Sequence, residues 1–158
     1  DRLAIAGGSN GGLLTGALVT QRPDLVRAAI VGVPLLDMLR YHKLLAGHSW
    51  TAEYGNPDVP EEAAYISKYS PYQNVKAGVK YPKIYIFTST KDDRVHPGHA
   101  RKMAAALQAA TCADPATHPI LLWVDREAGH GQGKPLNLRL RDAADQRAFL
   151  MWQLGMLG

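Results

Sequence analysis

Residues 2–14, R-L-A-I-A-G-G-S-N-G-G-L-L, decide the fold that this sequence predicts. A short apolar run at residues 3–6 opens the stretch, and its length between polar and glycine boundaries indicates a buried strand rather than a helix. After the glycines, apolar residues recur at helical spacing until about Gln21, just before an Arg-Pro-Asp turn. The predicted order is therefore strand, tight turn, helix.

The turn itself carries the pattern G-x-S-x-G at Gly7, Ser9 and Gly11, which is typical of the nucleophile elbow of α/β-hydrolases. Such an elbow needs glycines because the turn strains the serine backbone and leaves no room for neighbouring side chains. We expect the Ser9 hydroxyl at the N-terminus of the following helix and the Asn10 N–H as the first oxyanion donor. A glycine-rich loop that merely turns the chain or cradles a phosphate is the alternative interpretation.

Composition and charge narrow the class of protein. The 158 residues are 46% hydrophobic and 20% charged, as in one ordinary globular domain. No apolar run could span a bilayer, so a membrane partner is not expected. The net charge of +4 is modest, and no aromatic residues are interleaved with the basic ones, which argues against nucleic-acid binding.

The cysteine count and the start of the chain bear on its compartment. The single cysteine, Cys112, excludes an internal disulfide framework and slightly favours a reducing, cytoplasmic location. The sequence starts at Asp1, without methionine and directly before a predicted strand, so we expect that an N-terminal portion is missing. A periplasmic or secreted location therefore stays open.

Further along the chain, strands are expected at residues 28–33, 83–88 and 120–124, with a helix after the second of these and a closing helix at about 137–154. The closing helix is expected to bury Leu138, Ala144, Phe149 and Trp152. Residues 35–82 form an irregular insertion with short helical pieces and many aromatic residues, which suits a pocket wall. The sequence thus predicts an α/β fold with a parallel sheet flanked by helices.

Residue types of a catalytic triad follow three of the predicted strands. Ser9 follows the first strand, Asp92 and Asp93 the third and His130 the fourth. The carboxyl ends of parallel strands meet at one edge of the sheet, and Ser, Asp, His is the chain order of α/β-hydrolases. We expect His130 to take the Ser9 proton and one aspartate to orient the imidazole. The sequence by itself does not distinguish the two aspartates.

Three alternatives remain at this point. His130 could be a solvated loop histidine, and either aspartate could cap the helix near Pro97. Asp92, His96 and His99 could in principle bind a metal, although no further ligand cluster supports this, and we expect no metal and no cofactor.

Several motifs make the sequence similar to the catalytic domain of the prolyl oligopeptidase family, the post-proline serine endopeptidases. They are G-G-S-N-G-G-L-L at 7–14, G-H-S-W-T-A-E-Y-G at 47–55, K-Y-S-P-Y at 68–72, D-D-R-V at 92–95 and G-H-G at 129–131. The resemblance extends over nearly the whole chain. It implies an α/β-hydrolase fold and hydrolysis of short proline-containing peptides through an acyl-enzyme on Ser9.

The resemblance also implies roles for individual residues. Asp92 becomes the triad acid beside Ser9 and His130. Arg94 corresponds to the arginine that hydrogen-bonds a substrate carbonyl, and Trp50 to the indole that stacks on the substrate proline. Tyr54, Val95 and Asn10 are expected to line the same pocket. A proline ring offers no N–H, so recognition by shape and aromatic contact is physically reasonable.

The family has parts that these residues do not include, so we expect residues 1–158 to be the C-terminal part of the catalytic domain. The missing parts are a β-propeller, the upstream strands of the sheet, a tyrosine that is the second oxyanion donor and a phenylalanine of the proline pocket. The N-terminal remainder of the same protein is the expected partner, and these residues alone are expected to be weakly stable and nearly inactive.

Other functions stay open. A related serine hydrolase, such as an oligopeptidase B, an acylaminoacyl peptidase or an esterase, would share this architecture, and a non-catalytic fragment is a further alternative. A preference for basic residues would need acidic residues that converge on the pocket. The acidic residues of the insertion are scattered along the sequence: Asp37, Glu53, Asp58, Glu61 and Glu62.

Overall fold

Four strands form one parallel sheet in the computed structural model, which describes residues 2–131 and 134–157. They lie across the sheet in chain order: β1 (Ala4–Gly8), β2 (Ala28–Gly32), β3 (Lys83–Ser89) and β4 (Ile120–Asp125). All four predicted strands are confirmed, with their ends shifted by no more than two residues. Every residue of β2 is buried, as expected for an interior parallel strand covered on both faces.

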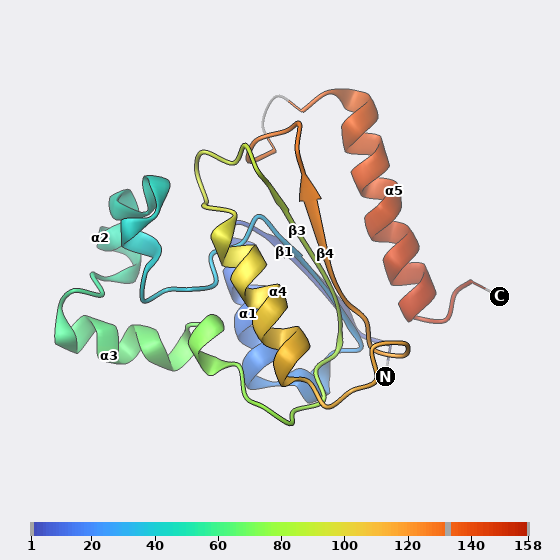
Figure 1. Ribbon diagram of the computed structural model, residues 1–158, viewed down its shortest axis with the longest axis horizontal. Coiled ribbons are helices and arrows are strands. Elements are labelled where there is room, and N and C mark those ends of the chain that lie inside the picture. The colour runs from blue at the N-terminus through green and yellow to red at the C-terminus, as the bar shows by residue number, and fades with distance from the viewer. Residues whose placement is uncertain (1, 132–133, 158) are drawn as a thin grey trace.

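Helices cover both faces of this sheet (Figure 1). α1 (Asn10–Gln21) and α4 (Gly98–Ala110) lie on one side, and α5 (Leu136–Gln153) lies on the other. The alternation of side chains along the strands supplies an apolar face to each layer. Ala29, Val31, Ile84 and Ile86 pack with residues of α1 and α4, whereas Ala28 and Ile30 pack with Phe149 of α5.

The closing helix α5 differs from the sequence prediction in its buried face. Of the four residues expected inside, Phe149 is buried, Leu138 is half-buried, Ala144 is exposed and Trp152 is 53% exposed. The buried contact is made near the C-terminal end of the helix, where Phe149 and Leu150 pack on the sheet. Helical periodicity predicts an apolar stripe, but it does not predict how far along the stripe a sheet lies beneath it.

The insertion between β2 and β3 forms short 3₁₀ helices and two α-helices, α2 (Thr51–Tyr54) and α3 (Pro60–Tyr69). It has a small core of its own, built from buried side chains of the insertion and its neighbours. Four partly buried residues pack against this core: Leu39, Trp50, Tyr54 and Tyr69. The buried members are Leu13, Leu35, Met38, Tyr41, Ile66 and Val95. The insertion is therefore a packed unit beside the sheet rather than an open loop.

A buried histidine of α4 fixes the start of the insertion. His99 Nδ1 accepts the backbone N–H groups of Leu36 and Asp37, at 3.3 and 3.0 Å. Burial lowers the pKa of His99 to about 4, so the ring is neutral at neutral pH and its lone pair is free to accept. This contact ties the insertion to the layer of helices that supports the sheet.

The strand β1 lies at the edge of the sheet formed by the described residues. Beside it, Leu3 is 53% exposed and Leu14 of α1 is 73% exposed. Among the described residues, no helix is long and apolar enough to cross a membrane.

Candidate active site

Ser9 lies in the sharp turn between β1 and α1, with φ 56° and ψ −118°. A non-glycine residue adopts this conformation at a cost, which the surrounding contacts must offset. The Ser9 N–H donates to Gly32 O at 2.9 Å and so ties the turn to the neighbouring strand. The strained turn predicted from the glycine pattern is confirmed.

The glycines on either side of the serine are required by close packing. A Cβ on Gly7 would lie 2.1 Å from Gly11 O, and a Cβ on Gly12 would lie 2.7 Å from Pro34 Cβ. Real side chains do not tolerate such distances, so α1 approaches β1 and the loop after β2 only because both positions are glycine. The elbow can therefore present the serine while its flanks pack tightly.

Three side chains distant in the sequence form a hydrogen-bonded chain at the carboxyl ends of the strands. His130 Nε2 lies 3.1 Å from Ser9 Oγ, and His130 Nδ1 lies 2.7 Å from Asp92 Oδ2. Asp92 and His130 reach this point from the loops after β3 and β4. The structure thus brings together the serine, histidine and aspartate in the geometry that general-base activation of a hydroxyl requires.

The structure also distinguishes the two aspartates of the loop after β3. The Asp92 side chain is fully buried, and its Oδ1 accepts the N–H groups of Arg94 and Val95 at 3.0 and 2.8 Å. Asp93 is exposed and lines the cleft instead. Asp92 therefore both folds its own loop, as the capping alternative suggests, and contacts the histidine.

Asn10 begins α1, so its backbone N–H has no acceptor within the helix. Its side-chain Oδ1 accepts a hydrogen bond from the Tyr54 hydroxyl at 2.8 Å. Burial, and then the neighbouring Glu53, raise the pKa of Tyr54 to about 12, so this hydroxyl keeps its proton at neutral pH. The insertion is thus joined to the residue directly after the serine.

A cleft of about 770 Å³ opens above these groups. Ser9, His130, Asp93 and Arg94 are among its lining residues. Two further lining residues, Ala46 and Lys91, were not predicted from the sequence, because nothing in the motif pattern singles out a small residue in the insertion or an exposed lysine in a loop. The cleft is large enough for several residues of an extended peptide.

The residues expected to recognise proline gather on the insertion side of the cleft. The Arg94 guanidinium lies over the Trp50 ring, 5.5 Å from its centroid. Val95 is buried in the small core against which Trp50 and Tyr54 pack. Trp50 is half-buried and does not line the 770 Å³ cleft itself. Arg94 lines the cleft and contacts the Trp50 ring.

The loop that carries His130 is held by a buried ion-pair network that sequence reasoning missed. Lys134 contacts the carboxylates of Asp125 and Asp142, and all three side chains are less than 20% exposed. Asp125 also accepts the N–H groups of Glu127 and Ala128, at 2.7 and 3.2 Å. Burial opposes ionisation of Asp125, but these hydrogen bonds, led by that of Lys134, lower its pKa to about 2.

A second cavity, of about 250 Å³, lies behind His130 and is lined by members of this network, Lys134, Asp125 and Asp142. In the sequence, Asp125 and Lys134 stand on either side of His130, and this pair of opposite charges could have suggested an ion pair. Nothing in the sequence, however, places Asp142 of α5 beside them.

The residues of the metal-binding alternative make other contacts. His99 Nδ1 accepts the two backbone N–H groups described above, and His96 Nδ1 accepts the N–H of Gly98 at 2.9 Å. Across residues 2–131 and 134–157, no three potential metal ligands cluster.

A parallel sheet with a serine elbow, and a histidine and an aspartate on the following strand ends, defines the class of α/β-hydrolases with a Ser-His-Asp arrangement. The model of the prolyl oligopeptidase family matches residues 1–157. The chain belongs to this family.

Similar proteins agree with this assignment. A prolyl endopeptidase of Elizabethkingia miricola is 43% identical over 157 residues, which are 99% of this chain and 22% of that protein. A structure from a study of two prolyl endopeptidases matches with a TM-score of 0.93 and 43% identity, over 98% of this chain and 22% of the other. The structure of oligopeptidase B from Leishmania major matches with a TM-score of 0.90 and 33% identity, over 97% of this chain and 21% of the other. The chain thus spans about a fifth of the length of these proteins.

Proposed function

We propose that the protein containing this chain is a serine peptidase that cleaves peptide bonds on the carboxyl side of proline, with an acyl-enzyme on Ser9. The observation that carries the proposal is the hydrogen-bonded chain from Ser9 through His130 to Asp92. Family membership adds support, because relatives that match nearly all of this chain are named prolyl endopeptidases.

Each of these three side chains has a role in the mechanism. His130 Nε2 takes the Ser9 proton as Oγ attacks the substrate carbonyl, and Asp92 stabilises the imidazolium that forms. The oxyanion of the tetrahedral intermediate faces the Asn10 N–H at the start of α1. His130 then protonates the leaving amine. A water molecule, activated by His130 in the same way, then attacks the acyl-enzyme and frees Ser9.

Proline selection is assigned to the insertion side of the cleft. A pyrrolidine ring would stack on the Trp50 indole, and the Arg94 guanidinium, already held over that ring, would donate to a substrate carbonyl. Tyr54 and Val95 would complete the wall, since both belong to the small core behind Trp50.

A basic-residue specificity of the oligopeptidase B type is less well supported. Asp37 is buried in an ion pair with Lys102, and Asp58 pairs with Lys43 and His42. Of the acidic residues named in the insertion, none lines the cleft above Ser9. Asp93 does line it, so turnover of matched proline and arginine substrates is the direct comparison.

Active-site labelling tests the catalytic proposal in the complete protein. A fluorophosphonate probe should label the wild type, and Ser9→Ala should abolish both labelling and cleavage of a prolyl substrate. Ser49→Ala, an exposed serine of the insertion, should leave both unchanged. Absence of labelling in the wild type would favour the non-catalytic alternative, and cleavage of arginine substrates in place of prolyl ones would overturn the specificity.

A further inference from the structure

Basic residues gather at the end of the sheet opposite the candidate active site. Arg27 directly precedes β2, Lys83 begins β3, and His118 lies two residues before β4. Backbone hydrogen bonds join these strand starts: Lys83 N donates to Arg27 O, and Ile84 N donates to Pro119 O. The parallel topology therefore places two cationic side chains and the His118 imidazole at one edge, where the like charges of Arg27 and Lys83 oppose each other.

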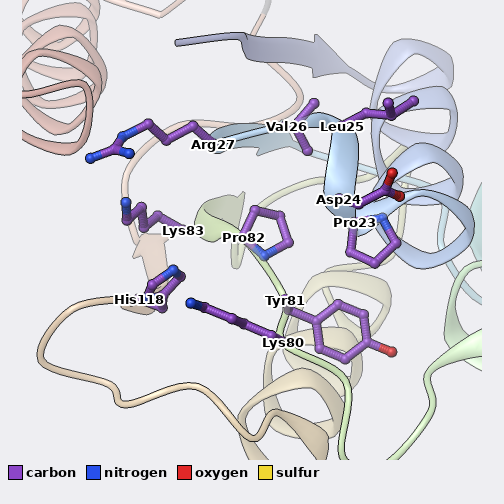
Figure 2. Close-up of a pocket in the computed structure, with 10 residues that line it drawn as sticks. All are labelled: Pro23, Asp24, Leu25, Val26, Arg27, Lys80, Tyr81, Pro82, Lys83 and His118. Atoms are coloured by element: carbon purple, nitrogen blue, oxygen red, sulfur yellow. The ribbon is translucent and has the colours of Figure 1, made fainter. Parts of the chain in front are cut away.

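These side chains line a pocket of about 260 Å³ together with Lys80. Figure 2 shows the nitrogen-bearing ends of Arg27, Lys83, His118 and Lys80 on the same side of this pocket, with Tyr81, Pro82 and Pro23 forming an apolar side. An adjoining cavity of about 510 Å³ shares all four basic residues and adds Gln153 of α5. The two cavities thus share a wall of basic residues.

One donor of this region is buried without a partner among the described residues. Gln153 is 5% exposed, and its buried Nε2 has no acceptor among those residues. Lys83 is 7% exposed as a residue and lines both cavities, but its ammonium group is not among the buried atoms that lack a partner. A buried donor is normally satisfied, so the Gln153 amide beside this lysine calls for an acceptor that the described residues do not supply.

The two nearby carboxylates accept hydrogen bonds from groups outside the cluster. Asp24 lines the same pocket, but both of its oxygens accept from Arg22, at 2.9 and 2.7 Å. Asp114 Oδ1 accepts the N–H of Ala116 in the loop before β4. Arg27 Nε donates to Gln153 O, which orients the guanidinium without neutralising it.

The titration behaviour agrees with an uncompensated cluster. Burial lowers the pKa of Lys83, and Arg27 and Lys80 lower it further. Burial also lowers the pKa of His118, with additional lowering by Lys83, Lys80 and Arg27 that Asp114 partly offsets. The pKa shifts of Lys83 and His118 thus both reflect burial beside positive charges.

We propose that this region is a binding site for a small oxyanion with at least two negative charges, of which inorganic phosphate is the type. Such an ion offers acceptors on every side, with one O–H group in the phosphate dianion and none in sulfate, which matches a site formed by Lys83, Lys80, Arg27, His118 and the Gln153 amide. It would neutralise the cluster, accept from the Lys83 ammonium group and satisfy the buried Gln153 amide. The site lies at the opposite edge of the sheet from Ser9 and does not depend on the peptidase proposal.

The test measures thermal unfolding and calorimetric binding of the complete protein with phosphate, sulfate and acetate at equal ionic strength. Phosphate and sulfate should raise the unfolding midpoint of the wild type and bind saturably, whereas acetate should not, because only a ligand that binds the folded state stabilises it. Ser9→Ala should respond as the wild type does, which separates this site from the active site.

Lys83→Met is the informative variant. It removes a buried charge without a large loss of volume, so the protein should fold at least as well, yet phosphate affinity should fall by about tenfold or more. Lys68→Met removes an equal charge from the exposed end of α3 and should bind phosphate normally.

Three results would overturn the proposal: equal phosphate stabilisation in the Lys83→Met variant, equal binding of acetate, or no binding at all. A structure of the complete protein in which one of its own carboxylates contacts Lys83 Nζ would also overturn it, because the acceptor would then be internal.

Discussion

At the scale of single residues, the site combines a strained backbone at Ser9 with an Asp92 side chain that hydrogen bonds hold in place. Ser9 has a positive φ of 56°, and the contacts that hold it come from glycines on either side and from a backbone hydrogen bond to β2. Asp92 is restrained by two backbone N–H groups and by His130 at once. Such preorganisation means that the groups need little rearrangement when substrate charge develops.

The substitution Trp50→Ala tests the pocket assignment at this scale. We expect kcat/KM for a prolyl peptide substrate to fall by about tenfold to a hundredfold, as for the loss of a stacked aromatic contact. A small ester that lacks proline should be hydrolysed at nearly the wild-type rate, since the hydrogen bonds of Ser9 and His130 do not involve the indole. An equal loss for both substrates would remove Trp50 from the pocket and assign it a packing role.

At the scale of elements, the candidate site is formed by the loops after three parallel strands. β4 and β1 lie at opposite edges of the described sheet, so the loop after β4 must bring His130 across the strand ends to reach Ser9. Its position depends on Lys134, which joins Asp125 at the end of β4 to Asp142 in α5. Burial opposes the charge of Lys134, but the two carboxylates raise its pKa, so the network stays ionised at neutral pH.

Removing Lys134 should therefore shift the histidine loop in the complete protein. For Lys134→Met we expect kcat to fall by about a hundredfold with little change in KM, because a displacement of about 1 Å at a reacting group has such an effect. Stability should also fall by about 3 kcal/mol, since two buried carboxylates lose their partner. The measurements are steady-state kinetics and denaturant unfolding, and Lys134→Arg should restore part of kcat.

The matched control for this prediction is Lys102→Met, which breaks another ion pair with a buried aspartate, Asp37, away from the histidine loop. It should lower stability while leaving kcat near the wild-type value. A drop in kcat of similar size in both variants would show that general destabilisation, and not loop position, determines the rate.

At the scale of the whole molecule, one edge of the described sheet, formed by β1, has no neighbouring strand. β1 carries the serine elbow and also lies at the edge of the described sheet, with Leu3 and Leu14 exposed nearby. An edge strand with unpaired backbone groups tends to pair with another chain. The relatives are about five times longer than this chain, and we propose that the remainder of the protein covers this edge.

Residues 1–158 produced alone should therefore self-associate and cleave prolyl substrates poorly. Sedimentation velocity should show oligomers that increase with concentration, and Ala6→Lys, at an exposed position of β1, should reduce them. A monomer that unfolds cooperatively and cleaves a prolyl substrate as fast as the complete protein would contradict this expectation.

Much of the architecture was decided by local sequence. Gly7 and Gly12 permit the tight strand-to-helix turn around Ser9, and short apolar runs between turn residues predicted all four strands. The order Ser, Asp, His after the first, third and fourth strands was read from the sequence, and a parallel sheet brings these strand ends to one edge. These features were predictable because each depends on sterics and periodicity within a few neighbouring residues.

Tertiary structure alone decided which groups meet. Asp92 rather than Asp93 contacts His130 because the backbone N–H groups of its own loop turn it inward. The Lys134 network joins residues from β4 and α5, and the cationic pocket joins the starts of three strands. Phe149, and not Trp152, fills the space beneath α5. Such contacts link segments far apart in the chain, and their choice depends on how packed layers fit together, which no local pattern encodes.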